Sequence, residues 1–74
     1  NEAPHTGNLI KAELARQQRS IAWLARQMGC SRQNLCRQLT HSYIGTDQLL
    51  KISIALRHDF FHCFSEYILI IFDM

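Results

Sequence analysis

Side chains able to perform acid–base or metal chemistry gather at one point of the chain: His58, Asp59, His62 and Cys63. The two histidines are four residues apart and would share one helix face beside the thiol, a spacing that suits zinc. This set lacks the four ligands of a structural zinc site, and neither His5 nor His41 has a spacing that completes it. The chain has no Ser-His-Asp set, no usefully spaced carboxylate pair and no phosphate-cradling glycine loop. We therefore expect no metal, no cofactor and no enzymatic activity.

A second group of side chains, of types that contact DNA, lies between positions 32 and 37: Arg32, Gln33, Cys36 and Arg37. The charge around them is one-sided, since five arginines and no acidic residue lie between Glu13 and Asp47. The formal net charge of +2 hides this asymmetry, because residues 41–74 are acidic on balance. A basic segment that coincides with hydrogen-bonding side chains favours a polyanionic partner such as double-stranded DNA.

Two short helices joined by a tight turn, over residues 20–39, are predicted to position these side chains. Ser20 and Ser31 are good N-caps, and Gly29 lies where the chain reversal needs a positive φ. Apolar residues recur at helical spacing on the inner faces: Ile21, Leu24, Ala25 and Met28 in the first helix, Leu35 and Leu39 in the second. Two helices at a steep angle, the outer one bearing hydrogen-bonding side chains, describe a helix-turn-helix DNA reader.

The segments on either side of this unit have distinct patterns. Residues 1–7 show no periodicity and are expected to form a loose arm, after which Asn8 caps a helix that runs to Arg19. Residues 40–45 are predicted to form a connecting loop whose hydroxyls and backbone amides can meet phosphates. Two residues of this loop are assigned to DNA contacts: Thr40 and His41.

Two more helices are predicted after the loop. The fourth is expected to begin with Thr46 as N-cap and to carry Asp47 in its first turn. Its inner stripe is widened by three further apolar residues: Leu49, Ile52 and Leu56, with Leu50, Ile54 and Ala55 beside them. The fifth helix begins at the cap Asp59 and carries an aromatic cluster that we expect in the core: Phe60, Phe61, Phe64 and Tyr67.

The chain ends in an apolar run, Tyr67–Met74, which is predicted to be either a strand or a continuation of the fifth helix. Such a run is an aggregation hazard unless something covers it. The simplest cover is the same segment of a second copy, so we expect a homodimer through this tail, with antiparallel strand pairing as one form of the contact. The chain then divides into the arm (1–7), a DNA-binding domain (8–66) and a dimerisation tail (67–74).

The sequence is typical of a cytoplasmic protein without a membrane partner. No window approaches the ~20 apolar residues of a spanning helix, and no signal-peptide layout opens the chain. The three cysteines, Cys30, Cys36 and Cys63, are odd in number and lack a CxxC pair, so we expect reduced thiols. Nothing in the sequence identifies a small-molecule effector.

The motif residues Leu24-Ala25, Gly29, Ser31-Arg32 and Leu35 make the chain resemble the phage-repressor and Cro type of helix-turn-helix proteins, the XRE family of bacterial transcriptional regulators. The stretch 45–56 is similar to that family's fourth helix, so the likeness covers about residues 8–64. It implies an all-α, five-helix lambda-repressor-like fold, a homodimer on a two-fold operator and the second motif helix in the major groove. It also implies a set of DNA-facing residues: Ser31, Arg32, Gln33, Cys36 and Arg37.

The resemblance assigns roles and also shows two departures. Arg32 or Arg37 would pair with guanine O6 and N7, and Gln33 with adenine N6 and N7. Ile21 stands where the family often has a phosphate-binding glutamine, and Gln38 stands at an apolar position, which predicts a shifted or frayed last turn.

Two functions from different classes are therefore considered. The first is sequence-specific DNA binding by a homodimeric transcriptional regulator, with residues 31–39 as the recognition helix. The alternative is a protein-interaction module, antitoxin-like or coactivator-like, that keeps the fold and docks through its apolar tail.

Overall fold

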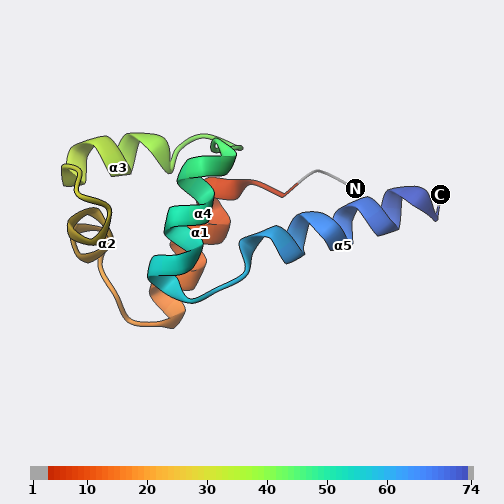
Figure 1. Cartoon of the computed structure of the whole chain (residues 1–74), viewed down its shortest axis with the longest axis horizontal. Helices are drawn as coiled ribbons and strands as arrows, with labels where there is room; N and C mark the ends of the chain where they lie inside the picture. Colours follow the sequence, from red (N-terminus) through yellow and green to blue (C-terminus); the bar gives the residue numbers. More distant parts are fainter. Residues whose placement is uncertain (1–3, 74) are drawn as a thin grey trace.

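The computed structural model describes residues 4–73 and shows five α-helices and no strand among those residues (Figure 1). In chain order the helices are α1 (Thr6–Arg16), α2 (Ile21–Met28), α3 (Arg32–Gln38), α4 (Thr46–Leu56) and α5 (Phe60–Phe72). The predicted all-α, five-helix class is confirmed. No helix in the described part is long and apolar enough to cross a membrane.

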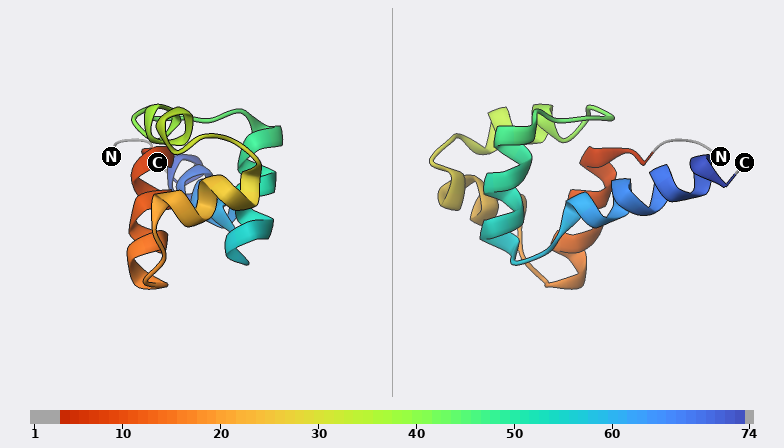
Figure 2. Two further views of the ribbon diagram at one scale, coloured as in Figure 1. Left: turned by 90° about the vertical axis from the view of Figure 1, so that its left-hand side faces the viewer. Right: turned by 45° about the vertical axis from the view of Figure 1, so that its right-hand side comes forward.

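Helices α1 to α4 form the body of the protein, and α5 projects from it (Figure 1). Seen along the long axis, α1 and α4 lie on opposite sides, α2 crosses between them and α3 lies over one end (Figure 2, left). The projecting α5 gives the molecule its dimensions of 41 × 21 × 20 Å. One hydrophobic core joins all five helices: Ile10, Leu14, Leu24, Ala25, Leu35, Leu39, Leu49, Ile52, Leu56 and Phe60.

Three of the predicted helix caps are confirmed. The side-chain oxygens of Ser20, Ser31 and Asp59 each accept a hydrogen bond from the backbone N–H three residues on, at 3.0 to 3.1 Å. Each bond satisfies an N–H group that has no partner within its helix. Gly29 ends α2 with φ +72°, a left-handed conformation that a residue with a Cβ resists.

The expected loose arm is wrong for residues 6 and 7, and residues 1–3 lie outside the described part of the chain. Helix α1 begins at Thr6, capped by the His5 ring instead of Asn8, and ends at Arg16 instead of Arg19. Both Thr6 and Gly7 are buried. Their backbone N–H groups donate to the carbonyls of residues 42 and 41, at 2.7 and 3.2 Å. This long-range contact with the loop after α3 extends the helix beyond its predicted start.

Helix α4 differs from its prediction at its start and on its outer face. Gly45 is the N-cap and makes no side-chain cap bond, whereas Thr46 is already helical. The predicted inner stripe, Leu49, Ile52 and Leu56, is buried. The prediction that three further residues widen this stripe is wrong for two of them, because Leu50 and Ile54 are exposed and only Ala55 packs against the core. An 11-residue helix at the side of a small body has too few neighbours to cover its whole circumference.

The apolar tail continues α5, so the strand alternative and antiparallel strand pairing are wrong for residues 67–72. Phe60 is buried and Phe64 packs against the core, but Phe61 is exposed, so the aromatic cluster is only partly a core element. The side chains from residue 68 to residue 72 are all exposed. A helix that leaves the body cannot bury its distal half against it.

Candidate nucleic-acid interface

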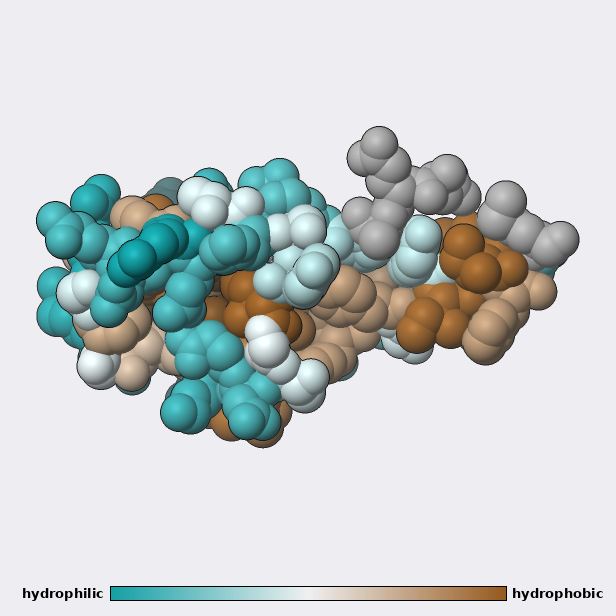
Figure 3. Space-filling model, turned by 90° about the horizontal axis from the view of Figure 1, so that it is seen from above, coloured by the Kyte–Doolittle hydropathy of each residue, from teal (hydrophilic) through white to brown (hydrophobic). Residues whose placement is uncertain are grey.

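Helix α3 has one buried face and one exposed polar face. Leu35 and the C-cap Leu39 point into the core and are fully buried. The rest of the helix surface is polar, and Figure 3, which looks down onto α3, shows hydrophilic side chains over this end and hydrophobic ones over α5. The chain reversal at Gly29 and the cap at Ser31 fix the direction in which α3 leaves α2. This arrangement leaves the outer face of α3 exposed to solvent.

The structure brings the residues assigned to DNA contacts onto one end of the molecule. Six of the seven are exposed: Ser31, Arg32, Gln33, Arg37, Thr40 and His41. Cys36 is half-buried, so its thiol is a smaller part of the surface. The Thr40 hydroxyl already donates to the Arg37 carbonyl at 2.6 Å and thereby helps to close the C-terminal end of α3.

Asn34 is a residue of this face that sequence reasoning missed. It is exposed, and its side-chain carbonyl accepts a hydrogen bond from the Arg37 guanidinium one turn later. The bond holds the guanidinium along the outer face of α3. The i, i+3 spacing of an amide and an arginine on a predicted outer face is the signal that could have indicated it.

The end of α3 explains one departure from the family pattern. Gln38 is half-buried, and its side-chain carbonyl accepts a hydrogen bond from the Gln48 amide of α4 at 3.0 Å. The core contact expected at this point is made by Leu39, directly after the last helical residue. The polar side chain is thus satisfied by α4, and α3 ends one residue before its apolar anchor.

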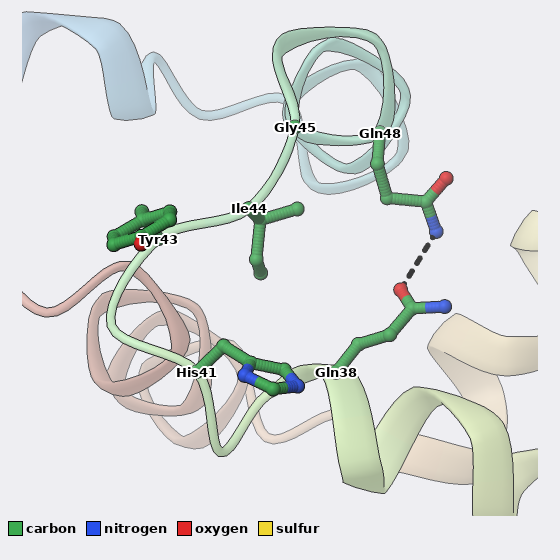
Figure 4. A pocket seen from close by; sticks show the side chains of 6 residues that line it. All are labelled: Gln38, His41, Tyr43, Ile44, Gly45 and Gln48. Atoms are coloured by element: carbon green, nitrogen blue, oxygen red, sulfur yellow. Dashed lines mark hydrogen bonds between the residues drawn. The ribbon is translucent and has the colours of Figure 1, made fainter.

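A pocket of about 340 Å³ lies between the end of α3 and the start of α4 (Figure 4). Ile44 points between the two amides that form the Gln38–Gln48 bond and the ring of His41. Tyr43 lies at its edge and is 82% exposed. The complete lining has no acidic or basic side chain apart from the imidazole: Gln38, His41, Tyr43, Ile44, Gly45 and Gln48. The exposed surface of its walls is mainly apolar.

Arg19 and Trp23 form a contact at the start of α2 that the sequence did not reveal. The guanidinium carbon of Arg19 lies 4.0 Å from the centre of the indole ring, a cation–π geometry. Trp23 itself is half-buried and packs against the core. The contact places a positive charge over the indole ring at the start of α2.

The buried Glu13 is ionised, and its negative charge is paired with the guanidinium of Arg16 within α1. Its carboxylate accepts hydrogen bonds from Arg16 and from Gln17, whose amide also donates to the Leu56 carbonyl at 2.8 Å. His58 Nδ1 lies 3.5 Å from the same carboxylate. The hydrogen bond from Arg16 is the main cause that lowers the pKa of Glu13 from 4.5 to about 2, against the opposing effect of burial.

The reactive-looking residues at the start of α5 have separate partners. Asp59 caps α5, and His62 Nε2 lies 2.8 Å from a carboxylate oxygen of Glu66. His58 instead faces Glu13 and packs edge-on against the ring of Phe60. Within residues 4–73, no three His, Cys, Asp or Glu side chains are placed to share a metal ion.

Comparisons with protein-family models, curated proteins and solved structures give no match for this chain.

Proposed function

We propose that this protein is a sequence-specific double-stranded DNA-binding regulator that acts as a homodimer. The observation that carries the proposal is the outer face of α3, where Arg32, Gln33 and Arg37 are exposed opposite a fully buried apolar face. The helix-turn-helix resemblance points to the same function, with α3 in the major groove.

The dimensions of α3 suit this role. A helix with its side chains is about 10–12 Å in diameter, and the major groove, about 12 Å wide, admits one such helix. Arg32 and Gln33 lie in its first turn, the part that reaches base edges in helix-turn-helix readers. Arg37, held by Asn34, lies one turn later. An arginine fork fits guanine, and a glutamine amide fits adenine.

Backbone contacts would come from both ends of the motif. Arg19, fixed over Trp23, supplies at the start of α2 the phosphate contact that a glutamine at Ile21 would have made. His41 and the backbone amides of the loop between α3 and α4 lie at the other end. Such contacts set the register of the protein on the duplex and carry no sequence information.

The test measures affinity for a selected site and for random duplex by fluorescence anisotropy at two salt concentrations. We expect the selected site to bind on the order of 10³-fold more tightly or better. Each neutralised phosphate should weaken binding roughly threefold between about 50 and 200 mM salt. Selection from a random duplex pool should return a palindromic motif if the homodimer is the binding unit.

A pair of double variants separates base reading from general charge. Arg32→Ala with Arg37→Ala should weaken binding to the selected site at least tenfold, because each bidentate base contact contributes about 1–3 kcal/mol. Lys11→Ala with Lys51→Ala removes the same charge from exposed positions on α1 and α4 and should cost less than threefold. Absence of duplex binding at low salt, or equal losses in both variants, contradicts the proposal.

The exposed distal half of α5 favours a second candidate, a protein-interaction module. Deletion of residues 67–74 would then abolish partner binding, and the Arg32→Ala, Arg37→Ala variant would leave it intact. The DNA-binding proposal instead expects the Arg32→Ala, Arg37→Ala variant to lose affinity for the selected duplex site. A pull-down and an anisotropy titration on the same two variants distinguish the candidates.

A further inference from the structure

Helix α5 carries polar side chains along one side and a row of apolar side chains along the opposite side. The polar stripe recurs at helical spacing: Asp59, His62, Glu66 and Asp73. The opposite side carries an apolar series at steps of three, four and three residues: Phe61, Phe64, Ile68 and Ile71. That spacing is the pattern of a helix that packs along another helix. We call the apolar series the α5 seam.

Most of the α5 seam is left uncovered by the described residues 4–73. Ile68 and Ile71 are 47% and 42% exposed, and Phe61 is 37% exposed. Only Phe64 packs against the core of the body. Figure 3 shows hydrophobic side chains gathered over this end of the molecule. A seam that continues a core contact out into solvent indicates a docking face for a second helix.

We propose that the α5 seam packs against the α5 seam of a second copy of this chain, with the two helices antiparallel. Thirteen residues give a helix about 20 Å long. In full antiparallel overlap, Ile68 and Ile71 of one copy lie beside Phe61 and Phe64 of the other. The inference rests on the homodimer of the proposed function, but it does not depend on DNA.

The shape of the molecule selects the antiparallel orientation. Paired helix axes lie about 8–10 Å apart, whereas the molecule measures 21 and 20 Å across its long axis. Seen along that axis, α5 lies within the outline of the body (Figure 2, left). A parallel pair would therefore force both bodies into the same space. An antiparallel pair places them at opposite ends of the helix pair.

The charges select a second copy over a lipid surface. All eight Lys and Arg residues precede residue 58, and residues 58–74 carry three carboxylates. Helices that lie on membranes are rich in Lys and Arg, and acidic ones are repelled by anionic lipid. Antiparallel packing brings the acidic end of α5, at Asp73, towards the basic body of the partner copy, where Arg57 precedes the other α5.

The size of the seam sets the expected affinity. The exposed members of the seam, Phe61, Ile68 and Ile71, present on the order of 250 Å². Pairing two seams therefore buries roughly 500 Å² in total, well below the range of standard stable interfaces. We expect a weak dimer with a Kd on the order of tens of micromolar to about 100 micromolar.

Sedimentation equilibrium of the full chain without DNA tests the seam. The same substitution is made at two neighbouring isoleucines, one inside the seam and one outside it. Ile71→Asp places a carboxylate in the seam of both copies and should raise the dimer Kd more than tenfold. Ile70 has similar exposure, 49%, but lies on the side of the polar stripe, so Ile70→Asp should change the Kd less than threefold. Circular dichroism checks that both variants keep the helical content of the parent.

A spin-label distance tests the orientation. With Asp73→Cys as the only cysteine, the two nitroxides of an antiparallel dimer lie roughly 20 Å or more apart, and those of a parallel dimer roughly half as far. Short distances overturn the antiparallel arrangement, and equal losses in the two Asp variants overturn the seam. A chain that stays monomeric at several hundred micromolar overturns the proposal, whether or not it binds phosphatidylcholine vesicles. Duplex binding by that monomer would still be decided by anisotropy, so the two proposals fail separately.

Discussion

Replacing Gly7 with alanine should destabilise the body, because the first turn of α1 lies against the backbone after α3. An alanine Cβ would lie 1.9 Å from the carbonyl oxygen of Leu39 and 2.6 Å from its carbonyl carbon. Neither atom can rotate away, so the helix start must move. It then loses the hydrogen bonds from Thr6 N–H to Ser42 and from Gly7 N–H to His41.

The magnitude follows from these losses. Each bond contributes about 1 kcal/mol net, and a buried group left unpaired costs about 1–3 kcal/mol. The better helix propensity of alanine returns up to about 1 kcal/mol. We expect the free energy of unfolding to fall by about 2–4 kcal/mol, a large part of the roughly 4–11 kcal/mol typical of a chain of this size.

The assay is urea unfolding followed by far-ultraviolet circular dichroism, with Trp23 fluorescence as a second probe. Gly45→Ala is the matched control, since no atom lies within 4 Å of the added Cβ and φ is −54°. That variant should lose no more than about 1 kcal/mol, because its Cβ meets no atom and the only cost is the weaker N-cap preference of alanine. If Gly7→Ala unfolds at the same urea concentration as Gly45→Ala, the close approach of α1 to the loop is refuted.

Two further predictions concern stability. The lowered pKa of Glu13, held mainly by Arg16, means that its contribution is complete above pH 4.5 and is lost as the pH falls towards 2. The loss should reach up to about 3 kcal/mol. Glu13→Gln should flatten the acid limb of the stability–pH curve, and an unchanged limb would contradict the assignment. Arg57 adopts φ +51° at the end of α4. Arg57→Gly should therefore raise the free energy of unfolding by about 0.5 kcal/mol. Lys51→Gly within the same helix should lower the free energy of unfolding by about 1 kcal/mol. If both variants shift the urea midpoint of the parent in the same direction, the argument is rejected.

The parts of the fold that were predictable from sequence are those fixed by local interactions. The caps at Ser20, Ser31 and Asp59 each depend on a residue and its neighbour three positions on, so the pattern alone indicates them. The start of α1 depends on a contact between Gly7 and the loop after α3, which no local pattern encodes. The exposed Ile54 shows the same limit, because periodicity identifies an apolar position but not the neighbour that would cover it.

The candidate interface divides in the same way. The spacing of Leu35 and Leu39 correctly predicts which face of α3 is buried, and therefore that Arg32 is exposed. The hydrogen bonds that hold the polar side chains of α3 depend on side-chain rotamers and on neighbouring helices. Two of them, Asn34 to Arg37 and Gln38 to Gln48, could not be predicted from spacing with that precision.

The attachment of the α1 start to the loop after α3 also bears on the order in which the protein folds. The bonds from Thr6 and Gly7 to Ser42 and His41 close a long chain segment that contains all of α2 and α3. Contacts between α2 and α3 are close in sequence and can form early, whereas closing the longer segment carries a larger entropic cost. During synthesis, the first turn of α1 leaves the ribosome before its backbone partners and gains them only after residue 42 has emerged. The first turn of α1 is thus completed only after α2 and α3, although it precedes both in the sequence.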